Sequence, residues 1–284
     1  MNRWVLAMGI LASVTTGAQE APARKDYPQD GVYWATNWWE GFEEARLRNV
    51  PIHVAILEDN SEPCAPLAAV YADRKFIEAS RMWVNLPSNP GTHEIDAEVK
   101  GRRVSVCERF WNVPCLAHSA NVKLVASWKN IDRPPVSIFT KAGLDVLGRV
   151  DGKAGAADLI KAQEKVLAKW PGHRLSAGEW LEAKPIWDEG MARFKMGNWR
   201  QSIDAFARLK KMSPDRAKEI GQLGWDQVDV EGDILWGEGF KMSADLKKAE
   251  EAKKLLRRVV KDFSPLPSAK KAQQTLDALA AHGH

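Results

Sequence analysis

Cysteine is scarce in this chain, with three residues among 284. So few cysteines exclude a small scaffold held together by many disulfides, and an odd number leaves at least one outside any disulfide within the chain. Clusters of basic residues are also missing, although the formal net charge is +4. We therefore predict neither a nucleic-acid partner nor attachment to a membrane surface.

Several motifs of enzymes are absent as well. The sequence has no glycine-rich phosphate loop, no Ser/His/Asp combination with supporting spacing and no pair of histidines at helical spacing. These absences remove the common signatures of nucleotide binding, serine hydrolysis and zinc proteolysis. Tryptophan, in contrast, occurs 13 times, and most of these side chains should anchor the core.

A hydrophobic run long enough to span a membrane in the mature protein is missing too. The chain begins with Arg3, an apolar run over residues 4–14, and small residues at positions 16–18. This pattern is typical of a secretory signal peptide over residues 1–18, cleaved after Ala18, with a retained N-terminal anchor as the alternative. We therefore expect a periplasmic or secreted protein, without membrane attachment after cleavage, in a compartment where disulfides persist.

The remaining chain is long enough for two domains. Residues 19–33 are rich in proline and charge and predict a linker. Asn37 is a good N-cap with Glu40 three residues later, so a helix is expected in TNWWEGFEEARLRN. The continuous apolar character of PIHVAILED predicts a strand that is covered on both faces, with helices on both sides of a sheet.

The elements that follow mix helical and strand patterns. We expect a helix over 65–80, a strand in 81–87, an inserted β-hairpin with strands at 94–99 and 102–107, a helix over 115–128, two strands within 134–152 joined by a turn at 141–143, and a helix over 157–170. The sequence therefore predicts an α/β domain with an inserted hairpin.

This layout resembles the thioredoxin-like family over residues 34–172. In that family the turn between a strand and the following helix carries Cys-x-x-Cys, often with proline before the second cysteine. The matching residues here are Ser61-Glu62-Pro63-Cys64. The resemblance also matches the family's cis-proline, which faces this turn, to Pro135.

The serine changes the chemistry that the resemblance implies. Thiol–disulfide exchange needs one thiolate to attack and a second thiol to resolve the mixed disulfide. Ser61 stands where the family has its exposed nucleophile, and Cys64 where it has the shielded second cysteine. We expect a turn disabled for ordinary exchange, with Cys64 as a small buried side chain, a partner of a distant cysteine or a metal ligand.

A second group of candidate residues lies in VCERFWNVPCLAH. The first interpretation is a disulfide between Cys107 and Cys115 that fixes the hairpin, worth about 2–3 kcal/mol in the chain-entropy model. The second is a zinc or copper site of Cys107, Cys115 and His118, with His93 as a fourth ligand. The third is a redox pair in which Cys115 is the nucleophile and His118 its base. The residues leave all three open.

Helical periodicity replaces the strand pattern in residues 173–284. The segment PIWDEGMARFKMGNWRQSIDAFARLKKMSP resembles a tetratricopeptide repeat in the placement of its small, aromatic and terminating residues. A second helical pair is expected from residue 233, with Asp245 as an N-cap and Ser264-Pro265 as the stop, followed by a last helix over 267–283. The resemblance implies an all-α helical-repeat domain that binds a protein or peptide; simple packing against the first domain is the alternative.

Three functions follow from these patterns. The first is an exported, non-enzymatic protein-binding or scaffold module without a cofactor. The second is a thiol–disulfide oxidoreductase using Cys107 and Cys115, or Cys64 with a distant partner. The third is a metal-binding protein using Cys107, Cys115 and His118, with zinc or copper. The fold alone does not choose among them.

Overall fold

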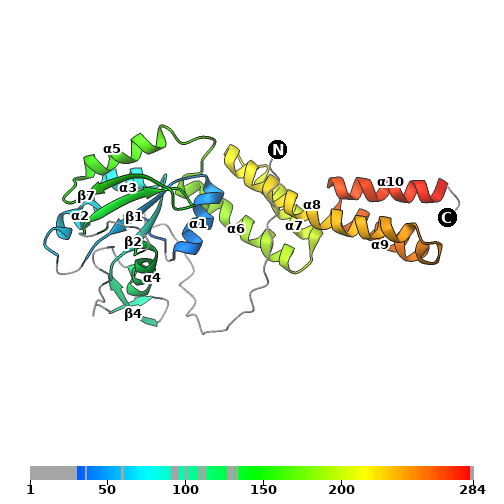
Figure 1. The fold of residues 1–284 in the computed structure, drawn as a ribbon, viewed down its shortest axis with the longest axis horizontal. Helices are drawn as coiled ribbons and strands as arrows, with labels where there is room; N and C mark the ends of the chain where they lie inside the picture. The colour runs from blue at the N-terminus through cyan, green and yellow to red at the C-terminus, as the bar shows by residue number, and fades with distance from the viewer. Residues whose placement is uncertain are drawn as a thin grey trace.

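The computed structural model describes residues 31–35, 37–58, 61–90, 96–99, 102–107, 110, 113–126, 131 and 134–281. An α/β unit is followed by a group of helices along the long axis of the molecule (Figure 1). The predicted order, an α/β part and then a helical part, is confirmed. The predicted signal peptide and residues 19–30 of the predicted linker lie outside the described residues.

A four-stranded mixed sheet is the centre of the α/β unit. Its order is β2-β1-β6-β7, with bounds β1 (Ile52–Ile56), β2 (Val84–Ser88), β6 (Val136–Thr140) and β7 (Val146–Asp151). β1 and β2 are parallel, whereas β6 is antiparallel to both β1 and β7. Trp34 adds a single parallel bridge to Asn85 on β2.

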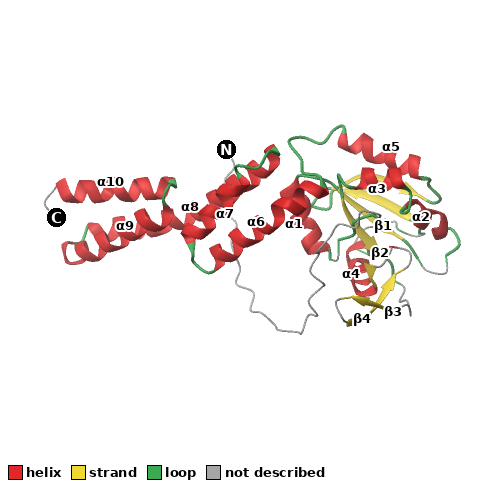
Figure 2. Cartoon of the chain, turned by 180° about the vertical axis from the view of Figure 1, so that it is seen from behind, coloured by secondary structure: helices red, strands yellow, loops and turns green. Residues whose placement is uncertain are grey.

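Helices cover both faces of this sheet (Figure 2). One face carries α1 (Trp38–Arg48) and α4 (Cys115–Val125); the other carries α2 (Cys64–Val70), α3 (Arg74–Ser80) and α5 (Ala156–Leu167). Every residue of β1 is buried, and alternate side chains point into the two layers. The predicted strand with two covered faces is therefore confirmed.

A smaller three-stranded sheet follows β2 in the chain. It contains β3 (Asp96–Val99), β4 (Arg102–Cys107) and β5 (Val113–Pro114), in the order β3-β4-β5. β3 and β4 form an antiparallel pair, as the predicted hairpin requires. The two-residue strand β5 was not predicted, because so short a strand has no periodicity of its own.

Two boundaries differ from the sequence-based expectation. The single helix predicted over 65–80 is wrong, because Asp73 starts a new helix by accepting a hydrogen bond from the Phe76 N–H at 3.0 Å. Val32 and Tyr33, which we assigned to the linker, are buried. The packed α/β unit therefore begins before residue 34.

The C-terminal region consists of long helices. They are α6 (Ala177–Lys195), α7 (Trp199–Leu209), α8 (Asp215–Ser243), α9 (Ala249–Phe263) and α10 (Pro267–Ala281), with a 3-10 turn, η2 (Leu246–Lys248), before α9. Asp245 caps this turn and α9 ends before Ser264, as predicted. The expectation that a second helical pair starts at residue 233 is wrong, because α8 is one helix of 29 residues. Nowhere in the described chain is a helix both long and apolar enough to cross a bilayer.

Glycines bring the helices of this region into close contact around Phe206. The Phe206 ring is fully buried and lies against Gly190 of α6 and Gly224 of α8. A Cβ atom on Gly224 would stand 2.4 Å from Phe206 Cδ1, and one on Gly190 would stand 2.5 Å from Cε1. Only a residue without a side chain fits at either position.

The two parts of the chain are joined through the last turn of α1. Arg48 is fully buried there, and its guanidinium donates to the carbonyl of Leu175, which leads into the helical region. From the other side, Arg216 of α8 donates to the carbonyls of Arg46 and Leu47. These bonds satisfy carbonyls that end without partners at a helix C-terminus. The helical region is thus attached to the α/β unit by hydrogen bonds from two side chains, Arg48 of α1 and Arg216 of α8.

Candidate functional site

The turn Ser61-Glu62-Pro63-Cys64 leads from β1 into α2. The Cys64 N–H donates to the Ser61 carbonyl at 3.0 Å, which closes the turn, and α2 begins at Cys64. Glu62 and Pro63 are exposed and Ser61 is half-buried, whereas Cys64 is 0 % exposed. The sulfur of the turn is therefore inside the protein, whereas Ser61, which carries a hydroxyl, is only half-buried.

The Cys64 sulfur lies in a largely apolar environment. It accepts one hydrogen bond from the Glu58 N–H at 3.4 Å and belongs to the buried cluster that includes Leu67 and Tyr71. A thiol in these surroundings behaves as a small hydrophobic side chain with weak hydrogen-bonding capacity. Reaction with a disulfide would require the turn to open first.

Pro135 directly precedes β6, the strand next to β1. The peptide bond between Pro134 and Pro135 is cis, which is the isomer implied by the resemblance. Pro135 is buried, and its carbonyl accepts a hydrogen bond from the Gly152 N–H at 2.9 Å.

Cys107 and Cys115 lie at the junction between the small sheet and α4. Cys107 is the last residue of β4 and pairs with Val113 of β5, and Cys115 is the first residue of α4. Both side chains are buried, and they share one hydrophobic cluster with Cys64. The predicted disulfide between them, like the redox pair, stays a prediction.

His118 follows one turn later in α4 and is fully buried. Its Nδ1 lies 2.7 Å from the carbonyl oxygen of Asn89, so Nδ1 carries the proton and donates. Among the residues that the structure describes, no three His, Cys, Asp or Glu side chains gather as metal ligands, and Cys107, Cys115 and His118 form no such group. His93, the fourth ligand predicted for zinc or copper, lies outside the described residues.

A buried polar group on the central strands was not predicted. His53, Asn85 and Ser137 each occupy the second position of their strand, in IHVAI, VNLPS and VSIFT. His53 Nδ1 lies 3.2 Å from Asn85 Oδ1, and His53 Nε2 lies 3.2 Å from Ser137 Oγ. A polar residue at the second position of each of three otherwise largely apolar strands was the available signal, but only the strand register brings them together.

The hydrogen bonds fix the tautomer of His53. Asn85 Nδ2 donates to the carbonyls of Tyr33 and Ser80, so Asn85 Oδ1 is the atom that faces His53 and accepts. His53 Nδ1 therefore carries the proton, and Nε2 accepts from the Ser137 hydroxyl. Both partners can satisfy the neutral ring, and no carboxylate among the described residues is recorded as bonded to it.

Burial lowers the pKa of His53 from 6.5 to about 4, against a smaller opposing effect of the hydrogen bond with Asn85. Tyr71, whose ring centroid lies 6.3 Å from that of His53, is also fully buried. Burial raises the pKa of Tyr71 above its ordinary range, Ser137 opposes the rise and the nearby Cys64 adds to it. The His53 and Tyr71 side chains are therefore both neutral at physiological pH.

This neutrality predicts a loss of stability in acid. As pH falls, the unfolded chain protonates His53 near pH 6.5, whereas the folded protein does so only near pH 4. The contribution of His53 is therefore complete above pH 6.5 and is lost as pH falls toward 4, by about 3 kcal/mol of unfolding free energy at 1.36 kcal/mol per pH unit. Urea unfolding at a series of pH values measures this loss.

Two variants separate the contribution of His53 to the pH dependence from that of other titrating groups. The loss between pH 6.5 and 4 should shrink in a His53→Leu chain, even though that chain is less stable overall. It should persist in a His173→Gln chain, because His173 is exposed. Equal pH dependence in wild type and His53→Leu would contradict the assignment.

Comparison with known proteins gives no family: no protein-family model and no curated protein matches this chain. The contacts described above are consequently the basis for assigning a role.

Proposed function

We propose that this chain is an exported protein-binding or scaffold module, built from a thioredoxin-like domain without thiol exchange and a tetratricopeptide-like helical domain. The thioredoxin-like assignment over residues 34–172 is supported by the sheet order β2-β1-β6-β7 and by the start of α2 at Cys64. Pro135 immediately before β6 agrees with it. Export follows from the signal peptide predicted over residues 1–18.

The assignment of the helical region rests on its packing. α6 and α7 form a helical pair in which small residues allow close approach, as Gly190 does against Phe206. Repeats of this type stack into surfaces that bind peptides or proteins. Residues 173–284 are accordingly proposed as the part that binds another protein.

The observation that carries the proposal is that the turn has a serine at position 61 and a buried cysteine at position 64. Position 61 offers a hydroxyl, and the only sulfur of the turn, Cys64, is fully buried. A serine hydroxyl is not ionised at neutral pH without a base, so the turn lacks an attacking group. The scaffold role is supported by a thioredoxin-like layout that lacks this attacking group.

Reduction of insulin disulfides by dithiothreitol tests this role. The wild-type chain should not accelerate reduction above the reagent alone, whereas Ser61→Cys should gain about 10-fold or more, since exchange requires two thiols in the turn. Ser61→Ala is the matched control and should remain inactive. In addition, alkylation of Ser61→Cys with and without reductant should reveal a reversible disulfide.

Disulfide reduction by the wild-type chain would overturn the scaffold role. Cysteine variants would then identify the residues responsible. Loss of that activity in Cys107→Ala or Cys115→Ala would favour the oxidoreductase that uses these two cysteines. Loss in Cys64→Ala alone would place exchange at the turn. Mass spectrometry after alkylation, with and without chelator, would in the same samples detect protection by a bound metal.

A further inference from the structure

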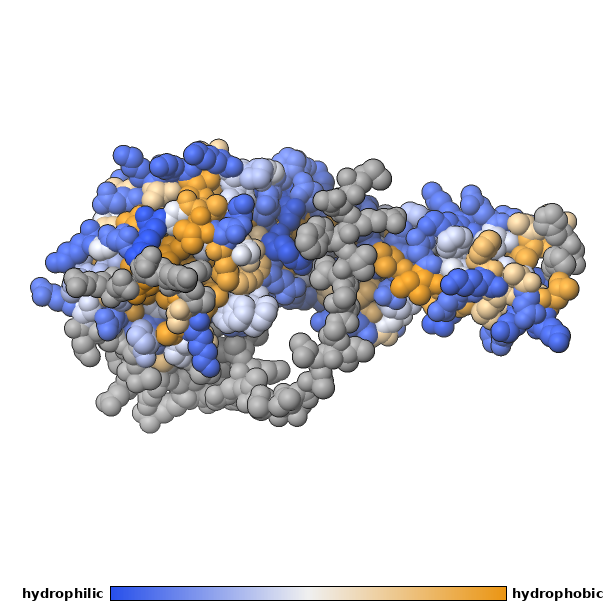
Figure 3. Space-filling model, in the orientation of Figure 1, coloured by the Kyte–Doolittle hydropathy of each residue, from blue (hydrophilic) through white to orange (hydrophobic). Residues whose placement is uncertain are grey.

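An exposed hydrophobic stripe runs along the outer face of α8. Leu223, Val230 and Ile234 are 40 %, 59 % and 52 % exposed, although each is a large apolar side chain. Their spacing of seven and four residues places them on one side of the helix. Figure 3 shows hydrophobic residues over the helical region, bordered by hydrophilic ones. We call these three residues the α8 stripe.

The face that α8 buries is a different one. Ala217, Ile220, Gly224, Val228 and Gly232 point into the helical core, where glycines allow α7, α9 and α10 to approach. Helix α8 is therefore already anchored by its inner face. The α8 stripe lies outside this buried face and leaves 40–59 % of each residue exposed.

Acidic residues border the α8 stripe on both sides. From residue 219 to residue 240 the sequence has six carboxylates and no Lys, Arg or His: Glu219, Asp226, Asp229, Glu231, Asp233 and Glu238. At 100° per residue, Asp226 and Asp233 fall on one side of the stripe and Glu231 and Glu238 on the other. Asp233 already pairs with Lys271, but Asp226, Glu231 and Glu238 are exposed or half-buried with no ion pair recorded among the described residues.

We propose that the α8 stripe binds a basic amphipathic helix of another protein. Such a helix presents an apolar stripe flanked by Lys or Arg, which complements an apolar stripe flanked by carboxylates. The stripe from Leu223 to Ile234 extends about 17 Å at 1.5 Å per residue, which matches about three turns of a partner helix. The inference rests on the proposed protein-binding function and specifies the chemistry of the partner.

A second copy of this chain complements the stripe poorly. Two α8 helices in a symmetric contact would place their acidic borders against each other, which is unfavourable. The basic helices α9 and α10 offer lysines, but their large apolar side chains are buried or half-buried in the described structure. In a second copy, neither α9 nor α10 therefore presents lysines together with large exposed apolar side chains.

The test measures binding of a designed peptide to the full chain. The probe is a fluorescent leucine–lysine peptide of about 18 residues, with leucine at every third or fourth position so that it forms one apolar face. A scrambled peptide of the same composition measures attraction by charge alone. We expect saturable binding of the amphipathic peptide in fluorescence anisotropy and at least about 10-fold weaker binding of the scrambled one, because only the first buries its leucines together.

Matched variants locate the binding. Val230→Ser with Ile234→Ser should weaken the amphipathic peptide at least about 10-fold, since two apolar contacts are lost. Val146→Ser with Leu246→Ser removes two exposed apolar side chains elsewhere and should leave affinity unchanged.

Charge variants test the acidic borders of the stripe. Glu231→Lys with Glu238→Lys should weaken binding more than Glu251→Lys with Asp277→Lys, which alters net charge equally but off the stripe. Thermal unfolding of each variant verifies that the fold is retained.

Several outcomes would overturn the proposal. Equal binding of the scrambled peptide, or unchanged affinity in Val230→Ser with Ile234→Ser, removes the α8 stripe as the site. A dimer in sedimentation that this double variant dissociates assigns the stripe to a second copy. Either result leaves the scaffold role intact, whereas disulfide reduction by the wild-type chain removes the scaffold role by a separate assay.

Discussion

Replacing Gly224 by alanine is expected to lower the free energy of unfolding by about 3 kcal/mol, because an added methyl overpacks a filled core. The new Cβ would stand 2.4 Å, 2.5 Å and 2.7 Å from three atoms of the Phe206 ring. The ring has no room to retreat, since it also lies against Gly190 of α6. Urea unfolding followed by circular dichroism measures the loss.

Gly237 provides a control on the same helix. Apart from the adjacent residues and backbone of α8 itself, no atom lies within 4 Å of the position where its Cβ would stand. Alanine has the better helix propensity, so Gly237→Ala should raise stability by about 0.5–1 kcal/mol. Two identical substitutions, 13 positions apart in α8, should thus act in opposite directions. Destabilisation of similar size in both variants would contradict the role assigned to Phe206.

The second large effect is expected at Arg48. Its Nη1 forms an ion pair with Glu44 at 2.7 Å, and the guanidinium also donates to the carbonyls of Leu175, Trp83 and Arg81. Arg48→Met would leave the buried Glu44 carboxylate without this partner. Breaking a buried pair from one side costs about 3–5 kcal/mol, so we expect a loss of that size in urea unfolding.

Two further variants separate the causes of this loss. Arg46→Met changes an exposed arginine of the same helix and should alter stability by less than about 0.5 kcal/mol. Arg48→Met combined with Glu44→Leu should be more stable than Arg48→Met alone, because the buried charge is removed with its partner. A double variant no better than the single one would show that the carbonyl contacts, rather than the ion pair, dominate.

Local signals in the sequence were sufficient for much of the fold. The cap at Asn37 accepts its hydrogen bond from the Glu40 N–H at 2.8 Å, and the hairpin pairs as its alternating runs indicate. Asp245 and Ser264 mark the ends that they predict. In each case the residues that determine the structure are neighbours in the chain, so a short window contains the information.

The elements that sequence reasoning missed depend on distant contacts. Five glycines from residue 221 to residue 239 suggest interruptions in a helix, yet α8 continues because several of them fit against side chains of other helices. Arg48 is an ordinary arginine near a helix end until it meets carbonyls 33, 35 and 127 residues away.

The candidate site shows the same division. The substitution of Ser61 for a cysteine is visible in the sequence, and so is the position of Cys64. The pairing of His53 with Asn85 and Ser137 is not visible, because it requires the register of three strands. The oxidation state of Cys107 and Cys115 depends on the surroundings of the protein as well as on its sequence.

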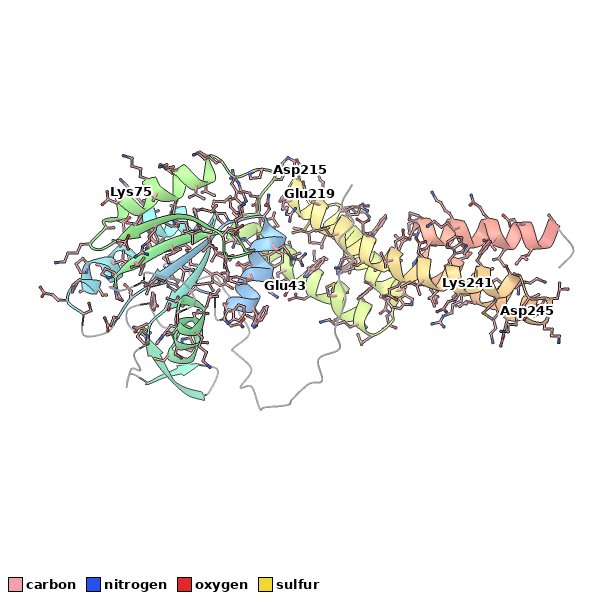
Figure 4. All side chains as sticks on the ribbon, in the orientation of Figure 1. Glu43, Lys75, Asp215, Glu219, Lys241 and Asp245 are labelled. Atoms are coloured by element: carbon pink, nitrogen blue, oxygen red, sulfur yellow. The ribbon has the colours of Figure 1, made fainter. Side chains whose placement is uncertain are left out.

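The continuity of α8 has a mechanical consequence. At 1.5 Å per residue its 29 residues form a beam about 43 Å long, so a tilt of about 5° at its first turn would displace its last turn by about 4 Å. Asp215 and Glu219 mark the clamped end, and Lys241 and Asp245 mark the distant one (Figure 4). In the first turn of α8, Arg216 donates hydrogen bonds to carbonyls of α1. A small change of angle at this end produces the largest displacement at the other end. The contact of Arg216 with α1 therefore contributes, together with the helices packed against α8, to the direction in which α8 points.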